Sequence, residues 1–112
     1  MVKKYVPDQG DIVWLDFNPQ QGHEQKGRRP ALVLSFKEYN EKIGLAIFCP
    51  ITSKIKGYPF EVEVMGEKIK GCVLSDQIKS LDWTIRNIEY IEKIKNEKLE
   101  EVINTVLLII KR

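Results

Sequence analysis

Polar residues stand at two places where apolar segments of the chain begin or end. Arg28 and Arg29 come directly before Pro30 and an apolar run, and Thr52 and Ser53 follow another apolar run. Proline disfavours helical geometry in the residue before it, so we expect Arg29 to be extended at the start of a strand. A guanidinium matches phosphate with a fork of donors, and a nearby hydroxyl can stabilise a developing oxyanion. If the two runs form neighbouring strands, Arg29 and Thr52 lie at one rim and can act on a phosphate.

Ordinary structural roles explain the same residues, and the residues alone favour them. Arg29 can form a surface salt bridge with Asp16 or Glu24, and Thr52 can be a turn residue. His23, the only histidine in the sequence, lies in a polar, glycine-flanked loop and is interpreted as a solvated residue. A single histidine excludes a ribonuclease mechanism that depends on a histidine pair.

Positive charge is concentrated on two predicted loops. Segments 23–29 and 52–58 together carry +4, whereas the whole chain carries only +2. Basic loops attract polyanions, but solvated loops often contain lysine, so charge alone leaves both interpretations open. Aromatic residues near these loops, such as Phe17 and Tyr58, are suited to stacking on unpaired bases, which contributes ~1–3 kcal/mol per base. Trp14 is expected to belong to the core.

Several other chemistries lack the residues they need. The sequence has no P-loop, GxGxxG, HExxH or GxSxG motif, and its carboxylates suggest no two-metal cluster. Cys49 and Cys72 lie in apolar runs without CxxC spacing, which predicts two buried free thiols and no zinc site. The sequence shows neither a signal peptide nor a long apolar run, so we expect a cytoplasmic protein without a membrane segment.

Short apolar or alternating segments must position these side chains. Strands are predicted at residues 12–17, 31–35, 45–51, 60–64, 71–76 and 85–91. A helical turn is expected within 36–44, a corner at 81–84, and a polar, functional loop at 18–29. With 112 residues, the chain is expected to form one domain spanning 1–112. This order predicts a mainly β (α+β) fold, a small antiparallel barrel with one helix on its side.

The C-terminal segment has the pattern of an amphipathic helix. Its apolar stripe at helical spacing consists of Leu99, Val102, Ile103, Val106, Leu107 and Ile110. Asn96 is the expected N-cap. Leu108 and Ile109 fall off the stripe, and we expect a partner subunit or the flank of the barrel to bury at least one of them.

Three blocks of the sequence resemble the signatures of the MazF/PemK toxin family. They run from Tyr5 to Ser35, from Pro50 to Val62 and from Val73 to Trp83, and the resemblance as a whole covers nearly the entire chain. The resemblance implies an SH3-like antiparallel β-barrel with a C-terminal helix, assembled as a homodimer. It also implies sequence-specific cleavage of single-stranded mRNA and inhibition by a cognate antitoxin. Any binding to a DNA operator would occur only through the antitoxin complex.

The resemblance further implies roles for individual residues. Arg29 and Thr52 match catalytic positions of the family, and Glu24 flanks the site as a candidate general base. Contacts with RNA are expected for Phe17, Lys26, Arg28, Ser53, Lys54, Lys56, Gln77 and Lys79. His23 departs from the family pattern, and its role stays open.

The implied reaction is attack of a ribose 2′-OH on the adjacent phosphate, which leaves a 2′,3′-cyclic phosphate and a 5′-OH and requires no metal or cofactor. Arg29 is a poor base, because lowering its pKa from ~12.5 to ~7 would require ~7.5 kcal/mol. Arg29 is therefore predicted to stabilise the phosphorane and to protonate the leaving oxygen, with Thr52 as a second donor.

Two other functions fit the same barrel. A gyrase-binding toxin family shares this architecture but acts through a terminal tryptophan, whereas this chain ends in LLIIKR. A plain RNA-binding module is the second alternative. A cleavage assay on unstructured RNA in the presence of EDTA would separate all three functions.

Overall fold

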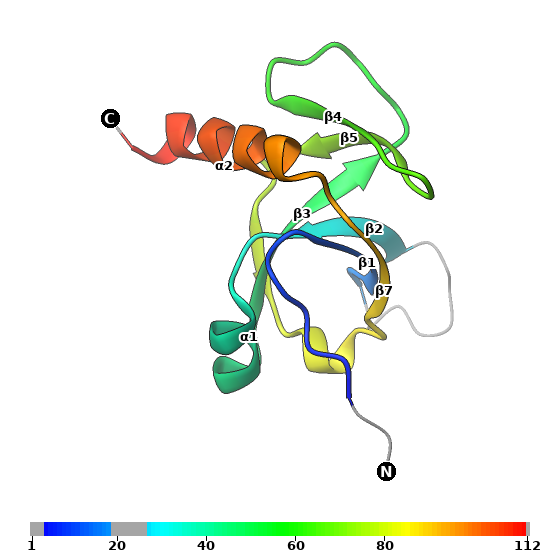
Figure 1. Ribbon diagram of the computed structural model, residues 1–112, viewed down its shortest axis with the longest axis vertical. Coiled ribbons are helices and arrows are strands. Elements are labelled where there is room, and N and C mark those ends of the chain that lie inside the picture. The colour runs from blue at the N-terminus through cyan, green and yellow to red at the C-terminus, as the bar shows by residue number, and fades with distance from the viewer. Residues whose placement is uncertain (1–3, 19–26, 112) are drawn as a thin grey trace.

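The computed structural model describes residues 4–18 and 27–111, which form a curled antiparallel sheet with helices beside it (Figure 1). The elements are β1 (Asp11–Asp16), β2 (Arg28–Val33), α1 (Lys37–Ile43), β3 (Ala46–Thr52), β4 (Glu61–Met65), β5 (Lys70–Leu74), β6 (Lys79–Leu81), β7 (Glu89–Lys93) and α2 (Asn96–Ile110). The strands follow the order β4-β5-β3-β2-β1-β7, and β6 pairs with β3 beside this path. The predicted mainly β fold with a C-terminal helix is confirmed.

The central strands are buried on both faces, because consecutive residues of each strand enter different apolar clusters. Ile12 and Leu32 pack in the cluster that includes the buried side of α2, whereas Val13 and Val33 pack in a second cluster around Trp83. Helix α2 lies beside β4 on one side of the sheet (Figure 1). The sheet therefore has a core on each side, and its functional groups lie at strand ends and in loops.

The predicted stripe of α2 is buried only along the first part of the helix. Leu99, Val102 and Val106 are buried, whereas Leu107 and Ile110 are exposed, because the C-terminal end of α2 projects beyond the sheet (Figure 1). The prediction of Asn96 as N-cap is wrong. Lys95 precedes the helix with the extended backbone of a cap residue and makes no side-chain cap bond, and Asn96 is already helical.

β2 begins three residues earlier than predicted. Arg28, Arg29 and Pro30 already pair with β1, while pairing with β3 starts only at Ala31. One edge of β2 is therefore unpaired at Pro30, which lacks a backbone N–H and is best tolerated at such an edge. Arg29 is thus part of a strand and not of the preceding loop.

The predicted strand at 85–91 is wrong over its first half. Trp83–Ile85 forms a 3₁₀ turn, and β7 starts only at Glu89. Asn87 has a φ of 51°, which lies in the left-handed region and interrupts an extended chain. The sequence also gave no sign of β6, because three residues are too few to show an alternating pattern.

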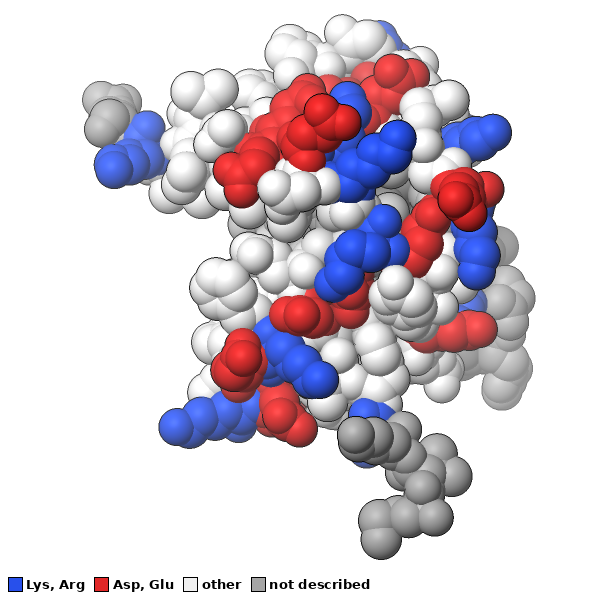
Figure 2. Space-filling model, viewed as in Figure 1, with Lys and Arg blue, Asp and Glu red and all other residues white. Residues whose placement is uncertain are grey.

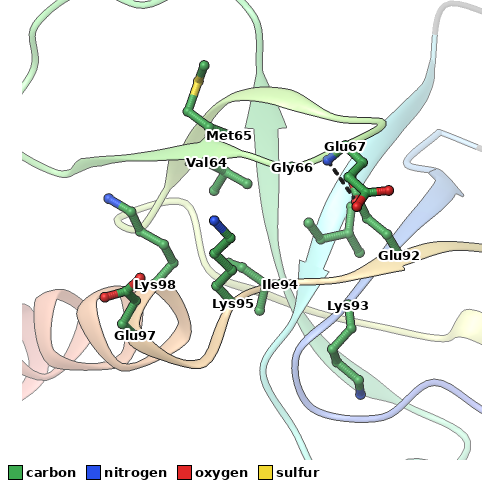
Figure 3. A pocket seen from close by; sticks show the side chains of 11 residues that line it. Val64, Met65, Gly66, Glu67, Glu92, Lys93, Ile94, Lys95, Glu97 and Lys98 are labelled. Carbon is green, nitrogen blue, oxygen red and sulfur yellow. Dashed lines mark hydrogen bonds between the residues drawn. The ribbon is translucent and has the colours of Figure 1, made fainter.

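The two edge strands of the sheet, β4 and β7, approach each other near the start of α2 (Figure 3). We call this place the β4–β7 seam. The Glu92 carboxylate accepts backbone N–H donors from Glu67 at 3.1 Å, Lys68 at 3.1 Å and Ile69 at 2.8 Å. A Cβ on Gly66 would lie 2.4 Å from a Glu92 oxygen, so a side chain there would displace the Glu92 carboxylate. One side chain of β7 thus fixes the β4–β5 turn.

Within the described ranges 4–18 and 27–111, no helix has the length and apolar content needed to cross a membrane.

Candidate active site

A pocket opens where the ladder between β2 and β3 ends. β3 pairs with β2 up to Pro50, and on its opposite edge it pairs with β5 at Ile51 and Thr52. Pro30 in β2 and Pro50 in β3 lack a backbone N–H, so neither can donate to a ladder at this point. The register that pairs Ala31 with Pro50 would place Arg29 opposite Thr52 if the ladder continued. We call this opening the β2–β3 split.

The split holds a pocket of about 440 Å³. Its lining residues are Arg29, Thr52, Lys54, Lys56, Tyr58, Glu61, Leu74 and Gln77. Five of the predicted catalytic or RNA-contacting residues therefore meet here. Among the described residues, the arginine and the two lysines of this pocket form no ion pair. Within the described part of the chain, the pocket thus presents three cations that are not held in ion pairs.

Glu61 holds the loop that forms one wall of the pocket. Its carboxylate accepts backbone N–H donors from Lys56 at 3.1 Å, Gly57 at 3.1 Å and Tyr58 at 3.3 Å. Gly57 has a φ of 76°, a conformation that glycine adopts without strain. These contacts direct the Glu61 oxygens toward the loop backbone, so its role in the pocket is to shape the wall.

Two hydroxyl groups of the pocket are available as donors or hold its walls together. The Thr52 Oγ accepts the backbone N–H of Lys54 at 3.1 Å, which leaves the hydroxyl proton of Thr52 available to another acceptor. The phenol of Tyr58 donates to Asp76, and this hydrogen bond raises the pKa of Tyr58. The phenol therefore stays protonated at neutral pH and joins the loop after β3 to the segment after β5.

The two cysteines are buried and free, as predicted. Burial, together with the smaller effect of the nearby Asp76 carboxylate, raises the pKa of the Cys49 thiol to about 12. Cys72 stands opposite Thr52 in the β3–β5 ladder, and burial also raises its pKa. Both thiols therefore stay neutral, and neither is a nucleophile for this pocket.

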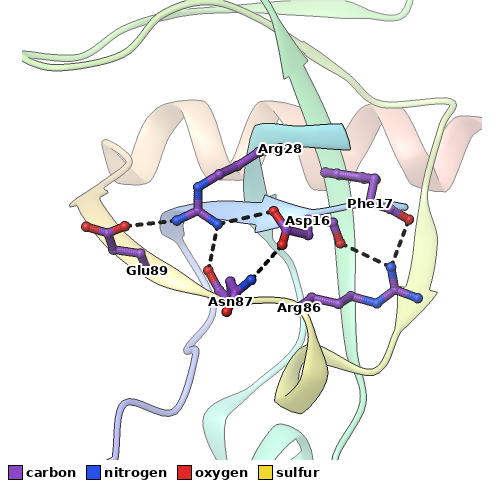
Figure 4. A network of polar contacts seen from close by, with 6 residues as sticks. All are labelled: Asp16, Phe17, Arg28, Arg86, Asn87 and Glu89. Atoms are coloured by element: carbon purple, nitrogen blue, oxygen red, sulfur yellow. Dashed lines mark hydrogen bonds and ion pairs between the residues drawn. The ribbon is translucent and has the colours of Figure 1, made fainter. Parts of the chain in front are cut away.

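Several predicted residues lie elsewhere. Arg28 binds Asp16 and Glu89 through its guanidinium (Figure 4), so the salt bridge considered for Arg29 belongs to its neighbour. The ammonium group of Lys79 lies 5.6 Å from the centre of the Phe17 ring. These two residues, both predicted to contact RNA, therefore lie beside each other and outside the pocket. Ser53 is exposed and does not line the pocket. Glu24, Lys26 and His23 lie outside the described residues.

Sequence reasoning missed three residues of this site. Glu61 looked like the solvent-facing half of an alternating strand, Leu74 looked like a core residue, and Asp76 was taken as the end of a strand. Only contacts between residues distant in the sequence reveal that the first two line the pocket and that Asp76 holds Tyr58.

Charge is unevenly distributed over the molecule. On the face shown in Figure 2, acidic side chains gather along α2, where Glu97, Glu100 and Glu101 are exposed. In the pocket, cations outnumber carboxylates by three to one. A polyanion is therefore attracted to the pocket and repelled by the exposed face of α2.

A family model described as the PemK-like, MazF-like toxin of type II toxin–antitoxin systems matches residues 8–110. The chain belongs to this family. It is 46% identical over 100 residues to the endoribonuclease toxin MazF of Escherichia coli K12, covering 89% of this chain and 90% of that protein. It is 35% identical over 109 residues to the endoribonuclease toxin ChpB of the same strain, covering 92% and 93%.

Solved structures of the PemK/MazF family have the same fold. A crystal structure of MazF from Deinococcus radiodurans superposes with a TM-score of 0.88 at 47% identity and covers 97% of this chain and all of that one. A MazE–MazF crystal structure from the same organism gives a TM-score of 0.86 at 42% identity, covering 96% and 98%. The family and fold predicted from the sequence are confirmed, and with them the prediction of a MazF-like endoribonuclease toxin at the level of the family.

Proposed function

We propose that this chain is the endoribonuclease of a type II toxin–antitoxin system and cleaves single-stranded mRNA at a specific short sequence. The observation that carries this proposal is the pocket at the β2–β3 split, where Arg29 and Thr52 meet beside two lysines. The endoribonuclease names of the MazF and ChpB relatives support it and favour a nuclease over a gyrase-binding toxin or a plain RNA-binding module.

The pocket supplies groups for transesterification within RNA. The ribose 2′-oxygen attacks the adjacent phosphorus and loses its proton to a base, and the bond from phosphorus to the 5′-oxygen breaks as that oxygen gains a proton. The Arg29 guanidinium is suited to stabilise the phosphorane and to protonate the leaving oxygen, and the Thr52 hydroxyl is a second donor. Glu24, which lies outside the described residues, is the proposed base. The products are a 2′,3′-cyclic phosphate and a 5′-OH.

We propose that cleavage requires no metal. Arg29, Lys54 and Lys56 provide positive charge where the phosphate would bind, which is the role that a metal ion plays in many nucleases. Over the described part of the chain, His, Cys, Asp and Glu side chains form no group of three or more that could hold an ion.

The proposal is tested by incubating an unstructured RNA with the purified protein in excess EDTA and analysing the ends of the fragments. We expect cleavage, with 2′,3′-cyclic phosphate and 5′-OH ends at one recurring sequence. Retained binding without cleavage would favour an RNA-binding module, and cleavage that chelation abolishes and magnesium restores would refute the metal-free mechanism.

The proposed partners are a cognate antitoxin and a second copy of this chain. A MazE antitoxin accompanies MazF in the crystal structure from Deinococcus radiodurans, and we propose an equivalent partner here, through which alone any operator DNA would be bound. Leu108 and Ile109 are 79% and 48% exposed, so the flank of the barrel does not bury them. We propose that a homodimer covers at least one of them.

Sedimentation velocity tests this interface. We expect a dimer for the unmodified protein and a monomer for Leu108→Glu, with Lys42→Glu on α1 as the matched control. A stable dimer that keeps both side chains exposed to solvent would contradict this assignment.

A further inference from the structure

A polar network lies beside the start of β2 and joins three segments of the chain (Figure 4). Arg28 Nη1 donates to Asp16 Oδ1 at 3.3 Å and to the Asn87 carbonyl at 2.8 Å. Arg28 Nη2 donates to Glu89 Oε1 at 2.9 Å. The side-chain amide of Asn87 donates to the second oxygen of Asp16 at 2.8 Å. The network therefore ties the end of β1 and the start of β2 to the turn that precedes β7.

The turn is held in its unusual conformation by further contacts with β1. Asn87 adopts a left-handed backbone, which asparagine tolerates better than most residues. Arg86, the residue before it, donates to the carbonyls of Asp16 at 3.1 Å and Phe17 at 2.8 Å. The backbone N–H of Asp16 in turn donates to the Arg86 carbonyl at 2.9 Å. Asp16 is thus fixed through both its backbone and its side chain.

This anchoring acts where β2 is least supported by its sheet. At Arg28 and Arg29 the strand pairs with β1 alone, because pairing with β3 begins at Ala31. Consecutive side chains of a strand project to opposite faces, so the network holds the strand from one face while Arg29 lines the pocket on the other. A displacement of the backbone at Arg28 would be transmitted directly to Arg29.

The charges of the network argue against a contact between Arg28 and RNA. The single guanidinium of Arg28 faces two carboxylates, those of Asp16 and Glu89, and its side chain is only 21% exposed. A phosphate would have to displace both carboxylates and would be repelled by them. Among the described residues, the cations of the pocket form no ion pair with a carboxylate.

We propose that Arg28, together with Asp16 and Glu89, is a positioning residue that holds Arg29 in place for catalysis and does not bind RNA. This inference rests on the proposed function of the pocket. It predicts that variants which break the network lower kcat and leave KM unchanged, whichever sign of charge they remove.

Steady-state cleavage of one RNA by Arg28→Met, Asp16→Asn and Glu89→Gln tests this, below the unfolding temperature of each variant. The matched controls are Lys42→Met and Glu38→Gln on α1. We expect Arg28→Met to lower kcat by about 10- to 100-fold, since misplacing a catalytic group by an ångström has such effects. Asp16→Asn is expected to lower kcat in the same direction, and the double variant Arg28→Met/Asp16→Asn to be little worse than the poorer single one, because the groups act as a unit.

The sign of the Asp16→Asn effect separates this role from an RNA contact. If Arg28 bound phosphate, Arg28→Met would raise KM and lower the salt slope by about one, and Asp16→Asn would lower KM by removing a negative charge. A purely structural role would lower the unfolding midpoint and leave kcat unchanged. Either result overturns the inference.

Two further outcomes keep the inference separate from the proposed function. Full activity of Arg28→Met beside an inactive Arg29→Ala refutes the positioning role alone, whereas failure of the unmodified protein to cleave RNA refutes both. If Arg28→Met does not fold, Glu89→Gln carries the same test, because Glu89 is 68% exposed and its loss disturbs the core least.

Discussion

The β2–β3 split and the β4–β7 seam are two openings in one curled sheet, and they differ in how particular charged side chains are bound. At the seam, Glu92 accepts three backbone donors and Lys93 pairs with the buried Asp11 at 2.6 Å. At the split, Arg29, Lys54 and Lys56 line the pocket with no ion pair among the described residues. The hollows are of similar size, about 350 Å³ and 440 Å³.

The comparison teaches that a hollow becomes a candidate site through groups that the fold leaves unbound. The seam joins two edge strands, and its Glu92 and Lys93 make contacts that hold the sheet together. At the split the β2–β3 ladder ends at Ala31 and Pro50, and its cations form no ion pair with any residue that the structure describes. Changes at the split should therefore affect activity, whereas changes at the seam should affect stability.

The largest effect is expected from Arg29→Ala at the split. Removing one preorganised oxyanion donor lowers a rate by about 10²–10³-fold, and Arg29 supplies charge as well as hydrogen bonds. Stability should change by less than about 1 kcal/mol, because the side chain is exposed and unpaired among the described residues. Single-turnover cleavage and urea unfolding of the same preparation measure both. An unfolded Arg29→Ala protein, or one that cleaves at the original rate, would remove the distinction between the two openings.

At the seam, Glu92→Gln is expected to lower stability and to leave cleavage unchanged. Replacing one acceptor oxygen by an amide group leaves backbone donors of the β4–β5 turn without a partner, which should cost about 2 kcal/mol of unfolding free energy. Urea unfolding measures this loss, with Glu63→Gln on the exposed face of β4 as the control. Cleavage per folded molecule should stay unchanged. A specific loss of activity with intact stability would mean that the seam also takes part in function.

A smaller effect at the split is expected from Lys56→Ala. A lysine that only attracts the RNA backbone should raise KM a few-fold and reduce the slope of binding against salt concentration by about one. Lys42→Ala on α1 is the control, since this residue lies outside the pocket. A fall in kcat at saturating RNA would instead place Lys56 among the catalytic groups.

The smallest effect concerns the pH dependence of stability and the hydrogen bond between Tyr5 and Asp11. Burial and a hydrogen bond from Tyr5 to Asp11 raise the pKa of the Tyr5 phenol above its ordinary value of 10.0. The folded state therefore favours the neutral phenol. The contribution of Tyr5 to the free energy of unfolding is complete below pH 10 and is lost as the pH rises further. Tyr5→Phe should be less stable than the unmodified protein at neutral pH, and thermal unfolding should show this gap narrowing above pH 10. A stability difference that widens above pH 10 would contradict a raised pKa of Tyr5 in the folded state.

Sequence patterns predicted most of the fold because buried strands and helices carry apolar residues at characteristic spacings. The continuous apolar run at 45–51 and the alternation at 60–64 correspond to β3 and β4, and the stripe beginning at Leu99 corresponds to α2. The early start of β2 was hidden because two arginines and a proline look like a loop, although the ladder with β1 includes them.

The candidate site was predictable only where one residue type carries the chemistry. Arg29 and Thr52 stood out because they flank apolar runs that became neighbouring strands. The different surroundings of Arg28 and Arg29 were not predictable, because they depend on Asp16 and Glu89 reaching one face of β2 from other strands. The contribution of Glu61 was equally hidden, since its three backbone partners lie in a loop without a sequence pattern.

The central claim, that Arg29 acts on the scissile phosphate from the β2–β3 split, is tested most directly by the single-turnover cleavage rate of Arg29→Lys in EDTA with the RNA saturated by protein. Lysine keeps the charge and loses the planar fork of donors. We predict a rate at least about tenfold below that of the unmodified protein, with RNA affinity unchanged, because a bidentate contact with the phosphorane is lost. An unchanged rate would contradict the claim and place the chemistry on other residues.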